Sequence, residues 1–215
     1  MQDPYTNENG VLINKLGITD YEELNIAERQ IGYNKLQSLN NIRIKCFNEE
    51  LIQGIHSYIF KDIFGWAGNY RTTPLYKEEV ILPRYSVPYS DPNSISHDLN
   101  GKLAEINSIR WNSLSEDQLI ETFARKMALV WKVHPFRDGN TRTILSFSYL
   151  FAREYGFDMD MNTFLNNLSR VYKNNKLVKY SLRDKFVLAS LDDKDYPEVK
   201  PLSKVYQKAI NNYRQ

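Results

Sequence analysis

The segment from His134 to Arg142 reads His-Pro-Phe-Arg-Asp-Gly-Asn-Thr-Arg, and it brings together an imidazole, a carboxylate, an amide and two guanidinium groups. His134 is a candidate base, because an imidazole with an ordinary pKa of about 6.5 can be neutral at pH 7 and accept a proton from a hydroxyl. Asp138 offers hard oxygen ligands for a Mg²⁺ ion shared with phosphates, and Arg142 can bind two phosphate oxygens at once. These groups predict phosphoryl or nucleotidyl transfer; the alternative is a capped turn with a structural His–Asp hydrogen bond.

The elements on either side of this segment explain how it is held. Pro135 ends the preceding helix, because a residue before proline is pushed out of the α region, and His134 becomes the last side chain of a buried helix. Phe136 is expected to anchor the loop in the core. Gly139 allows a positive φ angle, and the next helix begins within two or three residues. The loop amides and the positive end of that helix form a cradle for an anion, so we expect the 134–142 loop to bind phosphate.

Helical periodicity covers most of the remaining chain. Ser115 and Gln118 form a capping box before a strongly apolar stretch, Thr19–Glu22 fits a second box, and Asn48 can cap another helix. Gly156 is a natural helix stop. The predicted helices span residues 20–38, 48–65, 92–109, 115–133, 143–155, 162–173, 176–190 and 199–213.

Residues 70–92 break this periodicity. Four of the eight prolines fall there, at positions 74, 83, 88 and 92, and the β-prone residues Val80, Ile81, Tyr85 and Val87 lie between them. Proline cannot donate to a strand ladder, so the pattern predicts a short, edge-exposed β-hairpin or extended flap. A surface loop is the alternative.

Composition limits the classes of protein that the chain can belong to. Its 215 residues are 42% apolar and 25% charged, which indicates a globular domain, and only 9 glycines favour long helices. A net charge of +2 excludes a strongly basic nucleic-acid binder, and the single cysteine, Cys46, excludes an internal disulfide. The N-terminus is unlike a signal peptide, and no apolar run reaches the ~20 residues of a membrane span. We therefore expect one cytoplasmic domain, with no membrane and no direct nucleic-acid binding.

The nine-residue segment also resembles the signature of the Fic (Fic/Doc) family, His-Pro-Phe-x-Asp/Glu-Gly-Asn-x-Arg, which usually has Gly or Lys before the Arg. Eight of the nine positions fit, and Thr141 departs. The resemblance extends to a single Fic-like domain, 1–215, with similar segments at Asn14–Thr19 (near the end of an N-terminal leader, residues 1–18), Ile63–Arg71 and Ser181–Ser190.

The resemblance implies an all-α fold, a Fic-type helical bundle core with a short β-hairpin flap at 70–92. It implies Mg²⁺-dependent transfer of AMP from ATP to a Ser, Thr or Tyr hydroxyl of a target protein, with release of pyrophosphate. His134 would be the base, and Asp138 would hold Mg²⁺. Asn140 would position the α-phosphate, and Arg142 would bind the phosphate tail. The residues implied to bind nucleotide are Arg137, Gly139, Asn140, Thr141 and Arg142.

The same resemblance implies how a target is held and how the enzyme is restrained. The flap would dock the target by β-strand addition, with its edge at Tyr76, Lys77, Val80, Ile81 and Leu82. Many members carry an inhibitory helix with the pattern Ser/Thr-x-x-x-Glu-Gly/Asn. Here Thr19–Glu23 is followed by Leu24, and Ser169–Asn174 has Lys173 where Glu is required, so we find no internal inhibitor. We expect any restraint to come from a separate, antitoxin-like protein.

Two departures from the family pattern open alternatives. If position 141 needs a positive φ angle, the β-branched Thr141 is strained there, whereas it is harmless in a helix. Leu145 stands where many members carry a further Arg for the γ-phosphate. ATP would then be held more loosely, or another nucleotide or phosphate-containing group would be transferred. A catalytically silent protein-binding module is a further alternative, which the intact His134 and Asp138 argue against.

Overall fold

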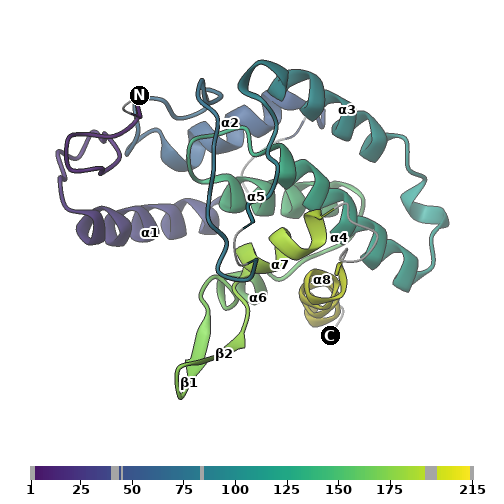
Figure 1. The fold of residues 1–215 in the computed structure, drawn as a ribbon. Helices are drawn as coiled ribbons and strands as arrows, with labels where there is room; N and C mark the ends of the chain where they lie inside the picture. Colours follow the sequence, from purple (N-terminus) through teal and green to yellow (C-terminus); the bar gives the residue numbers. More distant parts are fainter. Residues whose placement is uncertain (1–2, 40–43, 45, 83–84, 192–197, 214–215) are drawn as a thin grey trace.

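The computed structural model describes residues 3–39, 44, 46–82, 85–191 and 198–213 (Figure 1). Its helices are α1 (Tyr21–Gln37), α2 (Glu49–Phe60), α3 (Ile95–Asn107), α4 (Glu116–Val133), α5 (Asn140–Glu154), α6 (Met161–Leu165), α7 (Leu182–Ser190) and α8 (Lys200–Tyr213). Two 3-10 turns, η2 (Pro92–Ser94) and η3 (Trp111–Ser113), precede α3 and α4, and strands β1 (Val171–Lys173) and β2 (Lys176–Lys179) form an antiparallel hairpin. The predicted all-helical fold is confirmed, while the small hairpin of the described residues lies at 171–179 rather than in the predicted flap at 70–92. No helix in these described ranges has the length and apolar character needed to cross a membrane.

Helix α4 lies at the centre of the packing. It packs against α3, α5, α7 and α8, while α2 packs on α1 and α5. Its residues Phe123, Met127 and Trp131 are four positions apart, which places them on one face, and all three are buried. The C-terminal end of α4 and the N-terminal end of α5 are therefore both held by the core, and the 134–142 loop joins them.

Local sequence signals set most of the helix ends. The capping box of Ser115 and Gln118 begins α4, Asn48 caps α2, and Gly156 follows α5 with a φ angle of 77°. The predicted cap of α1 is one residue too early. The side chain of Asp20, rather than that of Thr19, accepts a hydrogen bond from the first turn of this helix.

The hairpin lies in a part of the chain where helical periodicity predicts helix. The predicted helix over 162–173 stops early, because α6 ends at 165 and β1 begins at 171. Of the predicted helix over 176–190, the first part forms β2 and the second part forms α7. Asn174 and Asn175 have positive φ angles of 48° and 59°, which suit a two-residue hairpin turn. The helix prediction is wrong there because these two asparagines favour a turn that interrupts the periodicity.

The flap, residues 70–92, is extended and forms no strand ladder among its described residues. A single bridge joins Glu79 to Leu82, and the N–H of Leu82 donates to the Glu79 carbonyl at 3.0 Å. Pro83 lies outside the described residues. In place of the predicted hairpin, the described part of the flap is a long loop with a tight turn at Glu79–Leu82, and it crosses the helices towards α7 (Figure 1). Prolines within it remove the donors that a ladder would need.

Candidate active site

The loop between α4 and α5 is held by the core. His134 ends α4 in the left-handed conformation, with a φ angle of 52°, and its N–H donates to the carbonyl of Trp131 at 3.0 Å. Phe136 is fully buried, which confirms its predicted role as an anchor. Gly139 has a φ angle of 77°, and a Cβ atom there would lie 2.4 Å from the ring of Phe60, so the position requires glycine.

The side chain of Asn140 closes the loop. Its amide oxygen accepts from the N–H of Phe136 at 3.0 Å, and its amide nitrogen donates to the Phe136 carbonyl at 2.8 Å. Helix α5 begins at Asn140, so the N–H groups of its first turn have no carbonyl partner within the helix. These groups, at the positive end of the helix dipole, are suited to bind an anion.

The imidazole of His134 is buried between two aromatic side chains. The ring of Tyr89 stacks on it with the centroids 4.0 Å apart, and Trp131 meets it edge-on at 4.9 Å. Its Nδ1 lies 3.3 Å from the Trp131 carbonyl, which only accepts, so Nδ1 carries the proton and Nε2 keeps a lone pair. Burial, and then the positive charges of Lys77 and Arg183, hold the pKa of His134 well below its ordinary value. The imidazole is therefore neutral at pH 7 and can accept a proton at Nε2.

Arg71 holds the backbone that carries His134. It is only 2% exposed, and its guanidinium donates to the carbonyl oxygens of His134 and Thr73, each at 2.9 Å, and to that of Ser90. Its own N–H donates to the carbonyl of Pro135 at 2.8 Å. One buried side chain thus ties both ends of the flap to the start of the loop.

His56 of α2 is a second buried histidine that supports the loop. Its Nδ1 accepts from the N–H of Gly68 at 2.8 Å, its Nε2 donates to the carbonyl of Asp138 at 3.1 Å, and its ring stacks on Phe136 at 3.8 Å. Both ring nitrogens are in use only if the imidazole is neutral. Burial lowers the pKa of His56 to about 3.

Replacing His56 with phenylalanine is expected to make the free energy of unfolding less sensitive to acid. The unfolded chain protonates His56 near pH 6.5 and the folded chain near pH 3, so stability is present above pH 6.5 and is lost as the pH falls below it. This residue alone contributes a slope of about 1.4 kcal/mol per pH unit. Urea unfolding from about pH 7.5 to pH 4.5 would measure both slopes. The variant is less stable at pH 7.5, because two hydrogen bonds are lost, but its slope should be shallower.

The control for this experiment is His97→Phe, which changes an exposed histidine on α3. Its slope should match that of the unmodified chain. Equal slopes in His56→Phe and the unmodified chain would contradict the buried, neutral state of His56.

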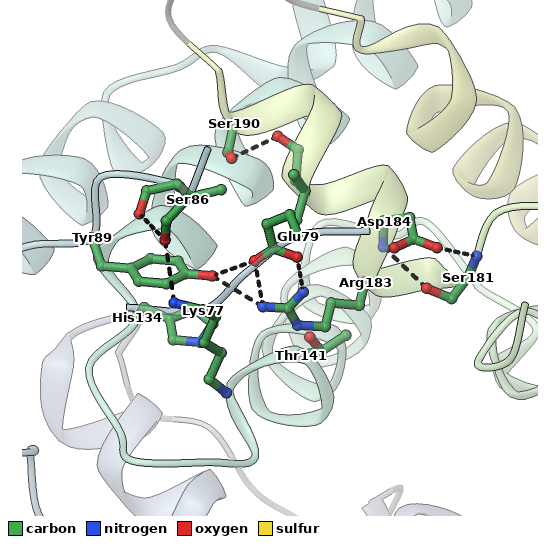
Figure 2. A network of polar contacts seen from close by, with 12 residues as sticks. Lys77, Glu79, Ser86, Tyr89, His134, Thr141, Ser181, Arg183, Asp184 and Ser190 are labelled. Atoms are coloured by element: carbon green, nitrogen blue, oxygen red, sulfur yellow. Dashed lines mark hydrogen bonds and ion pairs between the residues drawn. The ribbon is translucent and has the colours of Figure 1, made fainter. Parts of the chain in front are cut away.

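The candidate site is a cavity of about 680 Å³ at the open side of this loop. Its lining includes His134, Asp138 and the start of α5 at 139–142, together with Lys77 of the flap and Arg183 of α7. Residues of α1, together with Leu165 of α6 and Leu168 and Ser169 just after it, complete the lining. Figure 2 shows Lys77 extending past the imidazole of His134, with the guanidinium of Arg183 to the right of both. The structure therefore brings the base, the carboxylate and the helix N-terminus to one place.

Asp138 lines this cavity as a carboxylate. Burial would raise its pKa, but the charges of Lys77 and Arg142 and the N–H of Gly139, 2.5 Å from Oδ1, hold the pKa of Asp138 below its ordinary value. Its Oδ2 accepts no hydrogen bond from the described residues, and an ionised carboxylate with an oxygen to spare suits a hard cation. No group of three or more His, Cys, Asp or Glu side chains in the described ranges could hold a metal, so phosphates or water would complete the coordination.

Comparison with known proteins agrees with this geometry. Residues 46–152 match the Fic/DOC family. The chain belongs to the Fic/DOC family. It is 30% identical over 160 residues to the protein adenylyltransferase VbhT of Bartonella schoenbuchensis, a match that covers 74% of this chain and 32% of VbhT. The chain thus spans about a third of the length of that relative.

Solved Fic-domain structures share the fold. The N-terminal FIC domain of Bep8 from Bartonella sp. 1-1C superposes with a TM-score of 0.73 at 18% identity, over 96% of this chain and 94% of that one. BepC from Bartonella tribocorum, solved with bound AMPPNP, has a TM-score of 0.69 at 20% identity, over 95% of each chain.

Both departures from the Fic/DOC signature have a structural explanation. Thr141 lies inside the first turn of α5 and has no positive φ angle, so its β-branch is not strained. Its hydroxyl accepts from the indole N–H of Trp131 at 3.0 Å. Leu145 is fully buried and does not line the cavity. Lys77 of the flap, Arg29 of α1 and Arg183 of α7 bring positive charge to the cavity from other elements.

The two arginines of the Fic/DOC loop are both paired with carboxylates. Arg142 lines the cavity and forms an ion pair with Glu28 of α1. Arg137 donates to the carboxylate of Asp3 at 2.9 and 2.5 Å and does not line the cavity. The predicted nucleotide contacts of both arginines therefore stay predictions, and the position of Arg137 does not favour one.

The predicted docking residues of the flap fall into two groups. Tyr76 and Val80 are exposed, at 71% and 59%, whereas Ile81 and Leu82 pack against the core. Lys77 lines the cavity rather than the outer edge. Target docking itself stays a prediction.

Several residues reach the site without any motif that points to them. Glu28, His56 and Tyr89 have no sequence signal for this role. Arg71 and Arg183 do lie in segments that resemble the family, so the resemblance was a signal that could have located these two.

Proposed function

We propose that this chain transfers AMP from ATP to a Ser, Thr or Tyr hydroxyl of a target protein, with Mg²⁺ as cofactor. The observation that carries the proposal is that a neutral His134, an ionised Asp138 and the N-terminal end of α5 line one cavity. The name of VbhT as a protein adenylyltransferase and the AMPPNP bound to BepC support the same class of reaction.

In the proposed reaction, His134 takes the proton of the target hydroxyl at Nε2 while the hydroxyl oxygen bonds to the α-phosphorus of ATP. The bond from the α-phosphorus to the oxygen that bridges to the β-phosphate breaks, and pyrophosphate leaves. The N–H groups at the start of α5 stabilise the charge on the α-phosphate. Mg²⁺ held by Asp138 would neutralise charge on neighbouring phosphates. Asn140 maintains the loop and has one amide N–H left for the α-phosphate.

Lys77 supplies the positive charge that Leu145 does not provide. No described residue forms an ion pair with its ammonium group, and the side chain lines the cavity beside His134 (Figure 2). Its charge lowers the pKa of both His134 and Asp138, which is consistent with an ammonium group near both. Lys77 and Arg142 together would hold the phosphate tail.

The flap is the proposed docking surface for the target protein. The main-chain N–H groups of Lys77 and Leu82 already donate, to Ser86 Oγ and to the Glu79 carbonyl. The described residues of the flap form no strand ladder, so an added strand would pair with main-chain groups outside these bonds. The exposed side chains of Tyr76 and Val80 would lie beside that strand.

Labelled ATP tests this proposal. With α-labelled ATP, Mg²⁺ and a lysate as the source of targets, we expect labelled protein, and with γ-labelled ATP none. EDTA should remove the signal, and Asp138→Asn should lower it at least about tenfold. The matched control is Asp158→Asn, which changes an exposed aspartate. Label only from the γ position, or none from ATP, would overturn the proposal. Label from another nucleotide but not from ATP would favour the alternative that Leu145 opens.

Replacing Glu28 with glutamine is expected to lower the KM for ATP about fivefold, which corresponds to ~1 kcal/mol of removed charge repulsion. In the structure the Glu28 carboxylate forms an ion pair with the guanidinium of Arg142, so a phosphate tail must compete with Glu28 for that guanidinium. Steady-state rates at varied ATP would measure the change, with Glu22→Gln on the exposed face of α1 as control. A higher KM would mean that Glu28 instead holds Arg142 ready for phosphate.

Glu28 escapes a search for the inhibitory pattern because Leu24 precedes it by four positions and Arg29 follows it. A separate, antitoxin-like inhibitor remains a proposal of its own. Adding such a protein would then raise the KM for ATP further, in the unmodified chain as in Glu28→Gln.

A further inference from the structure

A polar cluster around the buried carboxylate of Glu79 joins the flap to α7 behind the candidate base. Glu79 of the flap has no exposed side-chain surface, and its carboxylate accepts from both terminal nitrogens of the Arg183 guanidinium, with Nη2 2.7 Å from Oε1. The phenol of Tyr89 donates to the same Oε1 at 3.1 Å and accepts from Arg183 Nη2 at 3.1 Å. Figure 2 shows the three side chains converging on one another beside His134.

Tyr89 links this cluster to the imidazole of His134. Its ring stacks on that of His134 with an angle of 22° between the planes. On the other side, the guanidinium of Arg183 lies 5.7 Å over the ring of Trp131, which meets the imidazole edge-on. The phenol therefore has its oxygen held by two hydrogen bonds and its face against the base.

Apolar side chains of similar size would hold a flap on α7 at least as well as an ion pair with a buried carboxylate, because burying a charge carries a desolvation cost. The charged cluster adds hydrogen bonds, which have a preferred direction. Both carboxylate oxygens, two guanidinium nitrogens and the phenol O–H are matched, which allows one orientation of the Tyr89 ring. That orientation sets the plane against which the imidazole of His134 packs.

We propose that Glu79, Arg183 and Tyr89 are positioning residues that couple the flap to His134, so that the segment proposed to dock the target also orients the base. The part of this inference that concerns turnover rests on the proposed function. The part that concerns the imidazole does not, because the contacts exist without substrate. Glu79 directly precedes Val80 in the flap, and Tyr89 directly precedes Ser90. A strand added along the flap would therefore act on the positions of both Glu79 and Tyr89.

Tyr89→Phe and Glu79→Gln test the proposal with little change of volume. Tyr89→Phe keeps the stacked ring and loses the phenol oxygen, and Glu79→Gln keeps the shape and loses the charge. We expect kcat for protein labelling to fall about tenfold in each, with the KM for ATP unchanged, since small misplacement of a base costs rate rather than nucleotide binding. Arg183→Lys should fall further, because lysine cannot reproduce the two parallel hydrogen bonds.

A readout without turnover comes from NMR of ¹⁵N-histidine-labelled protein. In the unmodified chain, the His134 ring should show one Nδ1-protonated form that does not titrate near pH 6.5. In both variants we expect a mixture of ring forms or exchange-broadened signals. The controls are Tyr21→Phe, on an exposed tyrosine, and Glu121→Gln, which removes the surface pair with Arg125. Thermal unfolding would verify that all variants are folded.

The outcomes separate this proposal from the proposed function. Altered His134 signals together with a lower kcat support the coupling. Altered signals in a chain that labels no protein under any condition support positioning but overturn the proposed function. Unchanged signals overturn the coupling, whether kcat is unchanged or only the KM for the target rises, because the cluster would then serve only to hold the flap.

Discussion

Replacing His134 with alanine is expected to lower the rate of AMP transfer by about 10²–10⁴-fold, because the target hydroxyl then loses the group that accepts its proton. The structure supports this size of effect, since the imidazole is neutral, its Nδ1 is engaged with the Trp131 carbonyl and its Nε2 forms no hydrogen bond with any described residue. The KM for ATP should change little. Transfer of label from α-labelled ATP to protein at saturating nucleotide would measure the loss.

Two further variants show that the loss is chemical. His134→Asn fits the left-handed backbone at this position, which asparagine tolerates well, and it should lose as much rate as alanine. His97→Ala makes the same change at an exposed histidine and should keep full activity. A His134→Ala variant that is folded and labels protein within about twofold of the unmodified chain would rule out this base.

Replacing Arg71 with alanine is expected to lower the free energy of unfolding by about 4 kcal/mol or more. The change removes donors from the buried carbonyl oxygen of His134 and from the half-buried ones of Thr73 and Ser90, and each buried group left unsatisfied costs about 1–3 kcal/mol. It also leaves a cavity in place of one of the largest fully buried side chains. Urea unfolding monitored by circular dichroism would measure the loss.

Arg71→Lys should recover only part of this stability, because an ammonium group cannot reach three carbonyls in the directions that a planar guanidinium does. Arg125→Ala is the control, since Arg125 lies on the surface, 42% exposed in its pair with Glu121, and should change stability by less than about 0.5 kcal/mol. If Arg71→Ala were as stable as this control, the flap would not depend on the Arg71 hydrogen bonds.

The chemistry of the site could be predicted because its parts are neighbours in the chain. His134, Asp138 and Gly139 follow one another within a turn whose ends are set by Pro135 and by the start of α5. Local backbone rules then place them at one helix N-terminus, and the cavity lining agrees with that placement. The capping box of Ser115 and Gln118 was likewise readable, because its two hydrogen bonds join residues three positions apart.

Prediction was least successful where two short patterns compete. Residues 171–179 carry enough apolar spacing to suggest helix, yet Asn174 and Asn175 turn the chain into a hairpin. In the flap, β-prone residues suggest a ladder that the prolines do not permit. In both segments the secondary structure depends on a few turn residues, and the spacing of apolar or β-prone residues does not single these positions out.

The sequence by itself determined a helical fold, the 134–142 loop and the kinds of group that this loop presents. Only the tertiary structure decided which partner each group has. Arg142 meets Glu28 across 114 positions, Arg183 meets Glu79 across 104, and Arg137 turns to Asp3 across 134. A charged side chain has many partners of opposite sign in the sequence, and the choice among them follows from helix packing, which brings a few within hydrogen-bond distance and buries them there.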